Sequence, residues 1–202
     1  MSDKKITASD VKKLRDMTGA GMMDCKRALT ETEGDLEKAI DLMRAKGAAK
    51  AAKRAEKSAN EGTIGSYVHF DSRTAVIVEL NCETDFVANT DDFKALAKDL
   101  ALHVASMAPM AVSPAEIPAE VIERERAVYV EQVKEEGNPD HIADKIVEGK
   151  LNKFFKQNTL LAQPFVKDSD KTIDELITEV SARTGEKIEV ARFCRMKVGQ
   201  NQ

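Results

Sequence analysis

Residues 63–82, TIGSYVHFDSRTAVIVELNC, are the stretch that decides the fold class. Its two parts, 63–70 and 74–82, are rich in β-branched side chains and partly alternate, which predicts one strand in each. The three residues between them (DSR, 71–73) fit the loop of a β-hairpin. One face of the second strand would carry the apolar side chains Val76, Val78, Leu80 and Cys82.

Helical patterns follow the hairpin. Residues 91–107 place Phe93, Leu96 and Leu100 on one face, and a charged helix is expected at about 118–136. The capping box Thr172-x-x-Glu175 predicts another helix, and alternation predicts a last strand at 188–198. Residues 160–166 are expected to be extended. The simplest closure is a small three-stranded antiparallel sheet packed with helices, so the fold class is α+β.

A sheet of three strands has exposed edges, and this one would carry apolar side chains on both faces, with Phe193 opposite Val190. Such a sheet needs a second layer or a second chain to be stable. We therefore expect a homodimer.

The first 47 residues predict three short helices. Thr7 with Asp10 forms a capping box for the first, which ends at Gly19. The second is expected from about Gly21 to Thr32, with Met22 and Met23 among its candidate buried residues, and the third is expected to end at Gly47. Residues 48–59, AAKAAKRAEKSA, have no apolar stripe and predict a solvated helix or linker. Its basic face is either a soluble connector or a contact for an acidic partner or RNA. That face consists of Arg44, Lys46, Lys50, Lys53, Arg54 and Lys57.

The charge of the 202-residue chain, −4 in total, is unevenly distributed. Residues 1–60 hold 14 Lys and Arg against 10 Asp and Glu, whereas residues 61–202 hold 17 against 25. An acidic body argues against general nucleic-acid coating. No apolar run is long enough to span a membrane, and no signal peptide is recognised. The three distant cysteines, Cys25, Cys82 and Cys194, suggest a reducing cytoplasm.

Catalytic and metal-binding patterns are scarce. His69, His103 and His141 lie in different elements without metal-ligand spacing. The Gly19-Ala20-Gly21 turn lacks the ending of a phosphate-binding loop. We therefore predict no catalytic residue, no metal and no cofactor.

The segment 83–90, ETDFVANT, joins a strand to a helix and holds a Phe-Val pair among acids. The pair is either a plug for the protein's own core or a wedge for a partner, because exposed aromatic residues next to charge are frequent hot spots. The residues alone leave both interpretations open.

Several motifs resemble the translation elongation factor Ts family. They are VKKLRDMTGAGMMDCKRAL at 11–29, GDLEKAI at 34–40, ELNCETDFV at 79–87, IVEGK at 146–150 and QPFV at 163–166. Longer members repeat the hairpin-plus-helix unit and add a C-terminal module, so this chain resembles the short form. The resemblance implies a ubiquitin-associated-like three-helix domain at 1–47, a basic helical linker at 48–61 and a core α+β dimerisation domain at 62–202.

The resemblance also implies a function. It implies guanine-nucleotide exchange on GDP-bound elongation factor Tu, with release of GDP and Mg²⁺, by a protein that is not an enzyme. A homodimer would give a two-plus-two complex, without direct contact to nucleic acid or membrane. The implied exchange loop is Thr84, Asp85, Phe86 and Val87. The implied partner-binding residues of the N-terminal domain are Val11, Leu14, Arg15, Thr18, Gly19, Gly21, Met22 and Met23.

Three other hypotheses remain. A helical adaptor would bind a partner without nucleotide release. A basic-helix RNA-binding protein would use residues 44–57 and show steeply salt-dependent binding. A metal-dependent hydrolase would use Glu83, Asp85 and Asp92 and would lose activity to a chelator.

Overall fold

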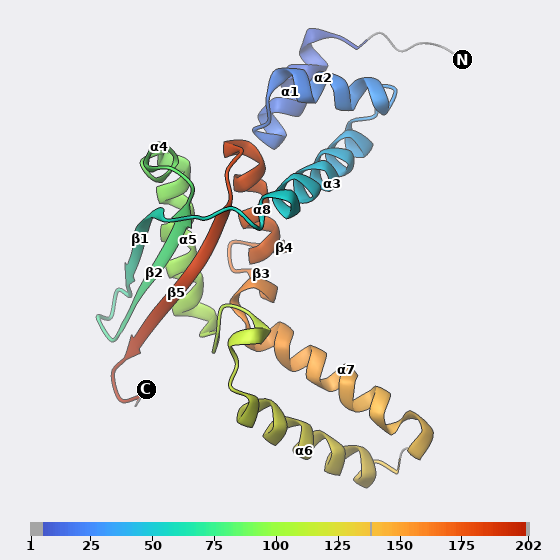
Figure 1. Cartoon of the computed structure of the whole chain (residues 1–202), viewed down its shortest axis with the longest axis vertical. Helices are drawn as coiled ribbons and strands as arrows, with labels where there is room; N and C mark the ends of the chain where they lie inside the picture. Colours follow the sequence, from blue (N-terminus) through green and yellow to red (C-terminus); the bar gives the residue numbers. More distant parts are fainter. Residues whose placement is uncertain (1–5, 138, 201–202) are drawn as a thin grey trace. The chain divides into compact units, whose positions relative to one another are not determined.

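The computed structural model describes residues 6–137 and 139–200 and has the α+β fold expected from the sequence (Figure 1). The chain divides into two compact units. The first contains the described residues up to Thr63, with Asn81–Lys94 and Ile177–Glu189. The second contains Ile64–Leu80, Ala95–Leu176 and the described residues from Val190.

The N-terminal helices of the first unit are α1 (Ala8–Thr18), α2 (Met22–Glu31) and α3 (Leu36–Arg54). The predicted capping box is confirmed, since Thr7 accepts from the backbone N–H of Asp10 and the Asp10 carboxylate accepts from the backbone N–H of Thr7. Gly19 ends α1 in the left-handed region with φ +66°. The buried cluster that holds the three helices together consists of Val11, Leu14, Cys25, Ala28, Leu29 and Ala39.

The predicted end of the third helix at Gly47 is wrong. Helix α3 continues through Gly47 to Arg54, because the alanine- and lysine-rich sequence after the glycine favours a helix. Gly47 is buried, and a Cβ there would lie 3.2 Å from the Cβ of Ala182. Its lack of a side chain therefore serves close packing rather than helix termination.

The three-stranded sheet has the order β1-β2-β5, formed by β1 (Glu61–Val68), β2 (Thr74–Cys82) and β5 (Ile188–Lys197). Helix α5 (Asp91–Met107) contacts this sheet so closely that a Cβ on Gly65 would lie 2.2 Å from the carbonyl oxygen of Ala97. The side chains that α5 and β2 contribute to the second unit are buried, as predicted: Val76, Val78, Leu80, Leu96, Leu100 and Val104.

Beyond α5, the short helix η1 (Pro114–Glu116) leads into a helical pair. This pair is α6 (Ala119–Glu135) and α7 (Asp140–Asn158), held together by a cluster that contains Val133, Val147 and Leu151. In the part of the chain that is described, no helix is both long and apolar enough to cross a membrane.

The extended segment predicted at 160–166 is wrong at residues 160–162 and confirmed at residues 163–165. Residues Leu160–Ala162 form the short helix η2, in which the backbone N–H of Gln163 donates to the carbonyl of Leu160 at 3.2 Å. The backbone N–H groups of Leu160 and Leu161 donate to the carbonyls of Ala111 and Val112. Strand β3 (Pro164–Phe165) lies within the predicted extended segment and pairs with β4 (Asp168–Thr172), which the sequence did not predict. The predicted capping box of Thr172 and Glu175 then starts α8 (Ile173–Thr184).

Candidate functional site

The segment after β2 forms a one-turn helix, α4 (Asp85–Ala88). Thr84 is its N-cap, and the Thr84 hydroxyl accepts from the backbone N–H of Val87 at 3.4 Å. Phe86 is 81% exposed, Val87 is half-buried and Ala88 is buried. The alternative left open by the sequence is thereby decided against a plug, because the Phe86 ring does not enter the protein's own core.

Two carboxylates fix the backbone before α4. One oxygen of Glu186 accepts from the backbone N–H groups of Glu83 and Thr84, at 3.1 and 3.0 Å. The other accepts from the Thr84 hydroxyl at 2.6 Å. Glu83 in turn accepts from the backbone N–H of Lys187 and from the Arg54 guanidinium, each at 2.7 Å. The segment 83–84 is therefore bonded to Arg54, well before it in the sequence, and to residues 186–187, well after it.

The same contacts set the local electrostatics. The Lys187 N–H bond, followed by the bond from Arg54, holds the pKa of Glu83 below its ordinary value, so Glu83 stays ionised. Burial, followed by the charge of Glu186, raises the pKa of the Cys82 thiol. The thiol donates to the carbonyl of Thr84 at 3.1 Å and so acts as a structural group.

One oxygen of the Glu83 carboxylate already accepts both of these hydrogen bonds, which counts against its use in the hydrolase hypothesis. Among residues 6–137 and 139–200, no group of three or more His, Cys, Asp or Glu side chains could hold a metal ion.

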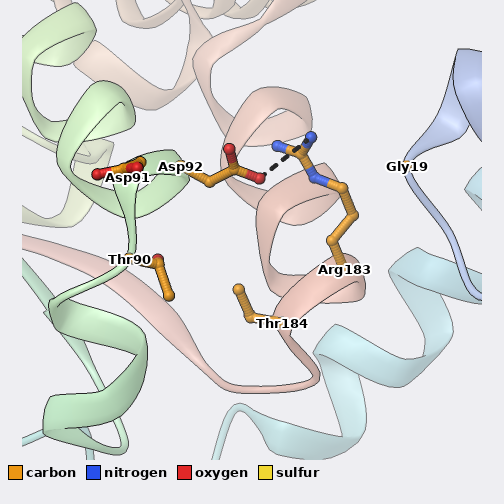
Figure 2. A pocket seen from close by; sticks show the side chains of 6 residues that line it. All are labelled: Gly19, Thr90, Asp91, Asp92, Arg183 and Thr184. Carbon is orange, nitrogen blue, oxygen red and sulfur yellow. Dashed lines mark ion pairs between the residues drawn. The ribbon is translucent and has the colours of Figure 1, made fainter.

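A hollow of about 420 Å³ lies near the end of this loop (Figure 2). Thr90, Asp91 and Asp92 line one side, and Gly19, Arg183 and Thr184 line the other. Figure 2 shows the Arg183 guanidinium turned toward Asp92, and their closest atoms are 3.8 Å apart. Gly19 here is part of a helix-to-helix turn, as the missing phosphate-loop ending predicted.

The residues proposed for the N-terminal domain fall into two groups. Val11 and Leu14 are buried in the bundle, and the half-buried Thr18 donates its hydroxyl to the Leu14 carbonyl. Their side chains therefore support the surface rather than form it. The exposed group consists of Arg15, Gly19, Gly21, Met22 and Met23.

Met22 and Met23 were candidates both for the core and for partner contact, and the core alternative is wrong, because they are 44% and 67% exposed. Helix α2 buries Cys25, Ala28 and Leu29, and its first turn lies outside that cluster. Met17, 57% exposed on α1, was not among the predicted site residues. The sequence feature that could have indicated its exposure is that Met17 lies outside the helix face that carries Val11 and Leu14.

The basic residues of α3 are partly occupied. Lys46 pairs with Glu31 at 2.7 Å, and Arg54 pairs with Glu83. The face predicted for an acidic partner or RNA is thus weaker in charge than its composition suggests.

Comparison with known proteins gives a consistent result. A family model described as "Elongation factor TS" matches residues 4–200. Elongation factor Ts of Thermosipho melanesiensis is 52% identical over 96% of this chain and 100% of the relative. That of Syntrophomonas wolfei is 55% identical over 96% and 91%, and that of Fervidobacterium nodosum is 52% identical over 97% and 100%.

Proposed function

The chain belongs to the elongation factor Ts family and therefore has a role in translation elongation. From this we propose that it is a guanine-nucleotide exchange factor. It binds GDP-bound elongation factor Tu and promotes the release of GDP and Mg²⁺. No covalent bond is made or broken by the chain itself.

The observation that carries this proposal is the exposure of Phe86 on a turn that is fixed by hydrogen bonds. A large apolar ring that is 81% exposed contributes little hydrophobic free energy to the free protein, and it contributes much to binding when a partner buries it. Phe86 is the apolar wedge, and the exposed Asp85 beside it perturbs polar contacts near the partner's metal. Thr84 and Val87 hold the loop, as the hydroxyl bond between Thr84 and the Val87 N–H supports.

The energetic logic is negative coupling between two ligands of the G protein. If binding of this chain weakens the binding of GDP by some factor, GDP weakens the binding of this chain by the same factor. Exchange then passes through a ternary complex in which the phosphate and Mg²⁺ contacts are strained. GTP displaces the chain at the end of the cycle.

The N-terminal helices, proposed as a separate docking domain, supply affinity rather than exchange. Met17, Met22 and Met23 form an exposed apolar surface on α1 and α2. Flexible thioether side chains suit a binding surface of this kind. Val11 and Leu14 contribute by holding the bundle together.

The test is a stopped-flow measurement of fluorescent GDP release from elongation factor Tu. We expect the release rate to rise with the concentration of this chain and then to saturate. Binding without faster release would instead identify a helical adaptor. Binding to RNA that falls steeply with salt, without any effect on GDP, would identify the RNA-binding alternative.

We further propose that the chain forms a homodimer through the outer face of the sheet in the second unit. Because Gly65 faces α5, its strand neighbours Ile64 and Val68 point to the opposite side, where they are 61% and 64% exposed. Ile77 on the central strand is 54% exposed. Such an open apolar face needs a covering layer, and a second copy provides a self-complementary one.

Mass measurement in solution tests this proposal. We expect twice the chain mass of 22.2 kDa at micromolar concentration, and we expect Ile77→Glu to reduce it to a single chain. Val128→Glu, on the exposed face of α6, is the matched control and should leave the mass unchanged. A single-chain mass for the unaltered protein would refute the dimer.

A further inference from the structure

The exposed turn that carries Phe86 is held by a carboxylate from a distant segment, and we infer that Glu186 is a positioning residue for nucleotide exchange. The inference rests on the proposed exchange function. Glu186 does not act on the partner itself; it fixes the backbone from which the Phe86 ring projects.

Both oxygens of the Glu186 carboxylate are used in this task. Three donors from two consecutive residues converge on it: the N–H of Glu83, the N–H of Thr84 and the Thr84 hydroxyl. Hydrogen bonds to an ionised acceptor are about twice as strong as those between neutral groups. The position of Thr84 is therefore determined from residue 186.

Thr84 in turn fixes the backbone of α4 through its own hydrogen bonds. Because its hydroxyl donates to Glu186, the lone pairs of the same oxygen are left to accept from the Val87 N–H. The Thr84 carbonyl also accepts from the Ala88 N–H at 3.2 Å. Phe86 lies inside this one-turn helix and is 81% exposed, so its placement comes from the backbone rather than from packing of its ring.

Glu186 is itself fixed in place. Gly185, with φ +75°, turns the chain out of α8 directly before it. The Ser181 hydroxyl donates to the Glu186 carbonyl at 2.5 Å. The neighbouring Lys187 donates its N–H back to the Glu83 carboxylate, so residues 83–84 and 186–187 are joined in both directions. This reciprocal bonding is what a rigid support for a wedge requires.

The variant that tests the inference is Glu186→Gln, which keeps the shape and removes the charge. Its amide can accept through one oxygen only, so at least one of the three donors loses its acceptor. Glu189→Gln is the matched control, because the Glu189 carboxylate bonds the Lys187 ammonium at 2.7 Å and lies three residues after Glu186 in the sequence. Unchanged hydrogen exchange at the buried strand β2 verifies that both variants are folded.

Two measurements on the full chain give the expected result. In Glu186→Gln, the backbone amides of Glu83 and Thr84 should exchange with solvent at least about tenfold faster. The maximal rate of GDP release from elongation factor Tu should fall about tenfold or more, because displacing a reacting or wedging group by about 1 Å can cost a factor of 10². The concentration for half-maximal rate should change less than the rate itself.

A double variant separates positioning from general damage. If Glu186 acts through Phe86, adding Glu186→Gln to Phe86→Ala should slow release no further than Phe86→Ala alone. A purely structural role would instead add its loss to that of Phe86→Ala. Additive losses, or a wild-type release rate in Glu186→Gln with its amides loosened, would overturn the inference. If the unaltered chain fails to accelerate release, the proposed exchange function fails, while the amide measurement still decides whether Glu186 fixes the turn.

Discussion

The replacement of Phe86 by alanine should affect exchange strongly and folding hardly at all. Fully burying a phenylalanine side chain is worth roughly 1.5–3 kcal/mol. Phe86 is 81% exposed in the free chain, so about four-fifths of that value is available to a partner. The loss in Phe86→Ala is thus about 2 kcal/mol, which corresponds to about 30-fold in rate. The free energy of unfolding should change by less than about 0.5 kcal/mol, as for other exposed positions.

The assay is stopped-flow release of a fluorescent GDP from elongation factor Tu at saturating concentrations of the variant. Phe70→Ala is the matched control, since Phe70 is 89% exposed on the β1–β2 hairpin. The solution mass of both variants is measured first, so that a change in assembly is not mistaken for a change in exchange. Phe70→Ala should retain the unaltered rate.

Two results would refute the reasoning. A Phe86→Ala chain that releases GDP at the unaltered rate would remove Phe86 from the mechanism. Equal losses in Phe86→Ala and Phe70→Ala would show that exposed aromatic area in general, rather than this turn, determines the rate.

Three more predictions follow from other parts of the chain. Met22→Glu combined with Met23→Glu should raise the concentration for half-maximal GDP release several-fold, roughly 1 kcal/mol in binding, with the maximal rate kept; a loss of maximal rate alone would contradict a docking role. Burial lowers the pKa of His103, so its contribution to stability is complete above about pH 6.5 and is lost as the pH falls toward the lower pKa of the folded state. Urea unfolding should therefore show a free energy of unfolding that decreases with falling pH in this range, and His103→Gln should remove that decrease. The same pH dependence in both proteins would disprove the assignment to His103. Gly65→Ala should destabilise by about 2 kcal/mol or more, because its Cβ would lie 2.2 Å from the Ala97 carbonyl oxygen, whereas Gly149→Ala in open space on α7 should stabilise by about 1 kcal/mol; thermal melts that shift in the same direction would refute this pair.

Local chemistry made much of the fold predictable. The capping boxes at Thr7 and Thr172 were predictable because their partners lie three residues along the chain. The hairpin, and the core face of β2, followed from alternation alone. The helix end predicted at Gly47 was wrong, because the sequence alone does not distinguish a glycine that permits close packing against Ala182 from one that ends a helix.

Other features of the fold depend on contacts between distant segments, which the local sequence pattern does not show. Residues 160–162 form a short helix, and the amides of Leu160 and Leu161 are held by the carbonyls of Ala111 and Val112, about fifty residues earlier. Met22 and Met23 have the apolar character of core residues, yet small side chains such as Cys25 and Ala28 already complete the bundle. Their exposure depends on how many helices are available to cover them, which one helix's sequence does not contain.

The candidate site likewise has features that the sequence predicts and features that depend on distant contacts. The aromatic and acidic character of Asp85 and Phe86 is visible in the sequence, but the exposure of the ring depends on where the turn is held. That hold comes from Glu186, which is 102 residues from Thr84. No short sequence spacing indicates such a pair, because its two residues belong to elements that are far apart in the sequence. A four-residue helix alone is too short to be stable in water, so the turn that carries Phe86 requires this kind of non-local support to keep its shape.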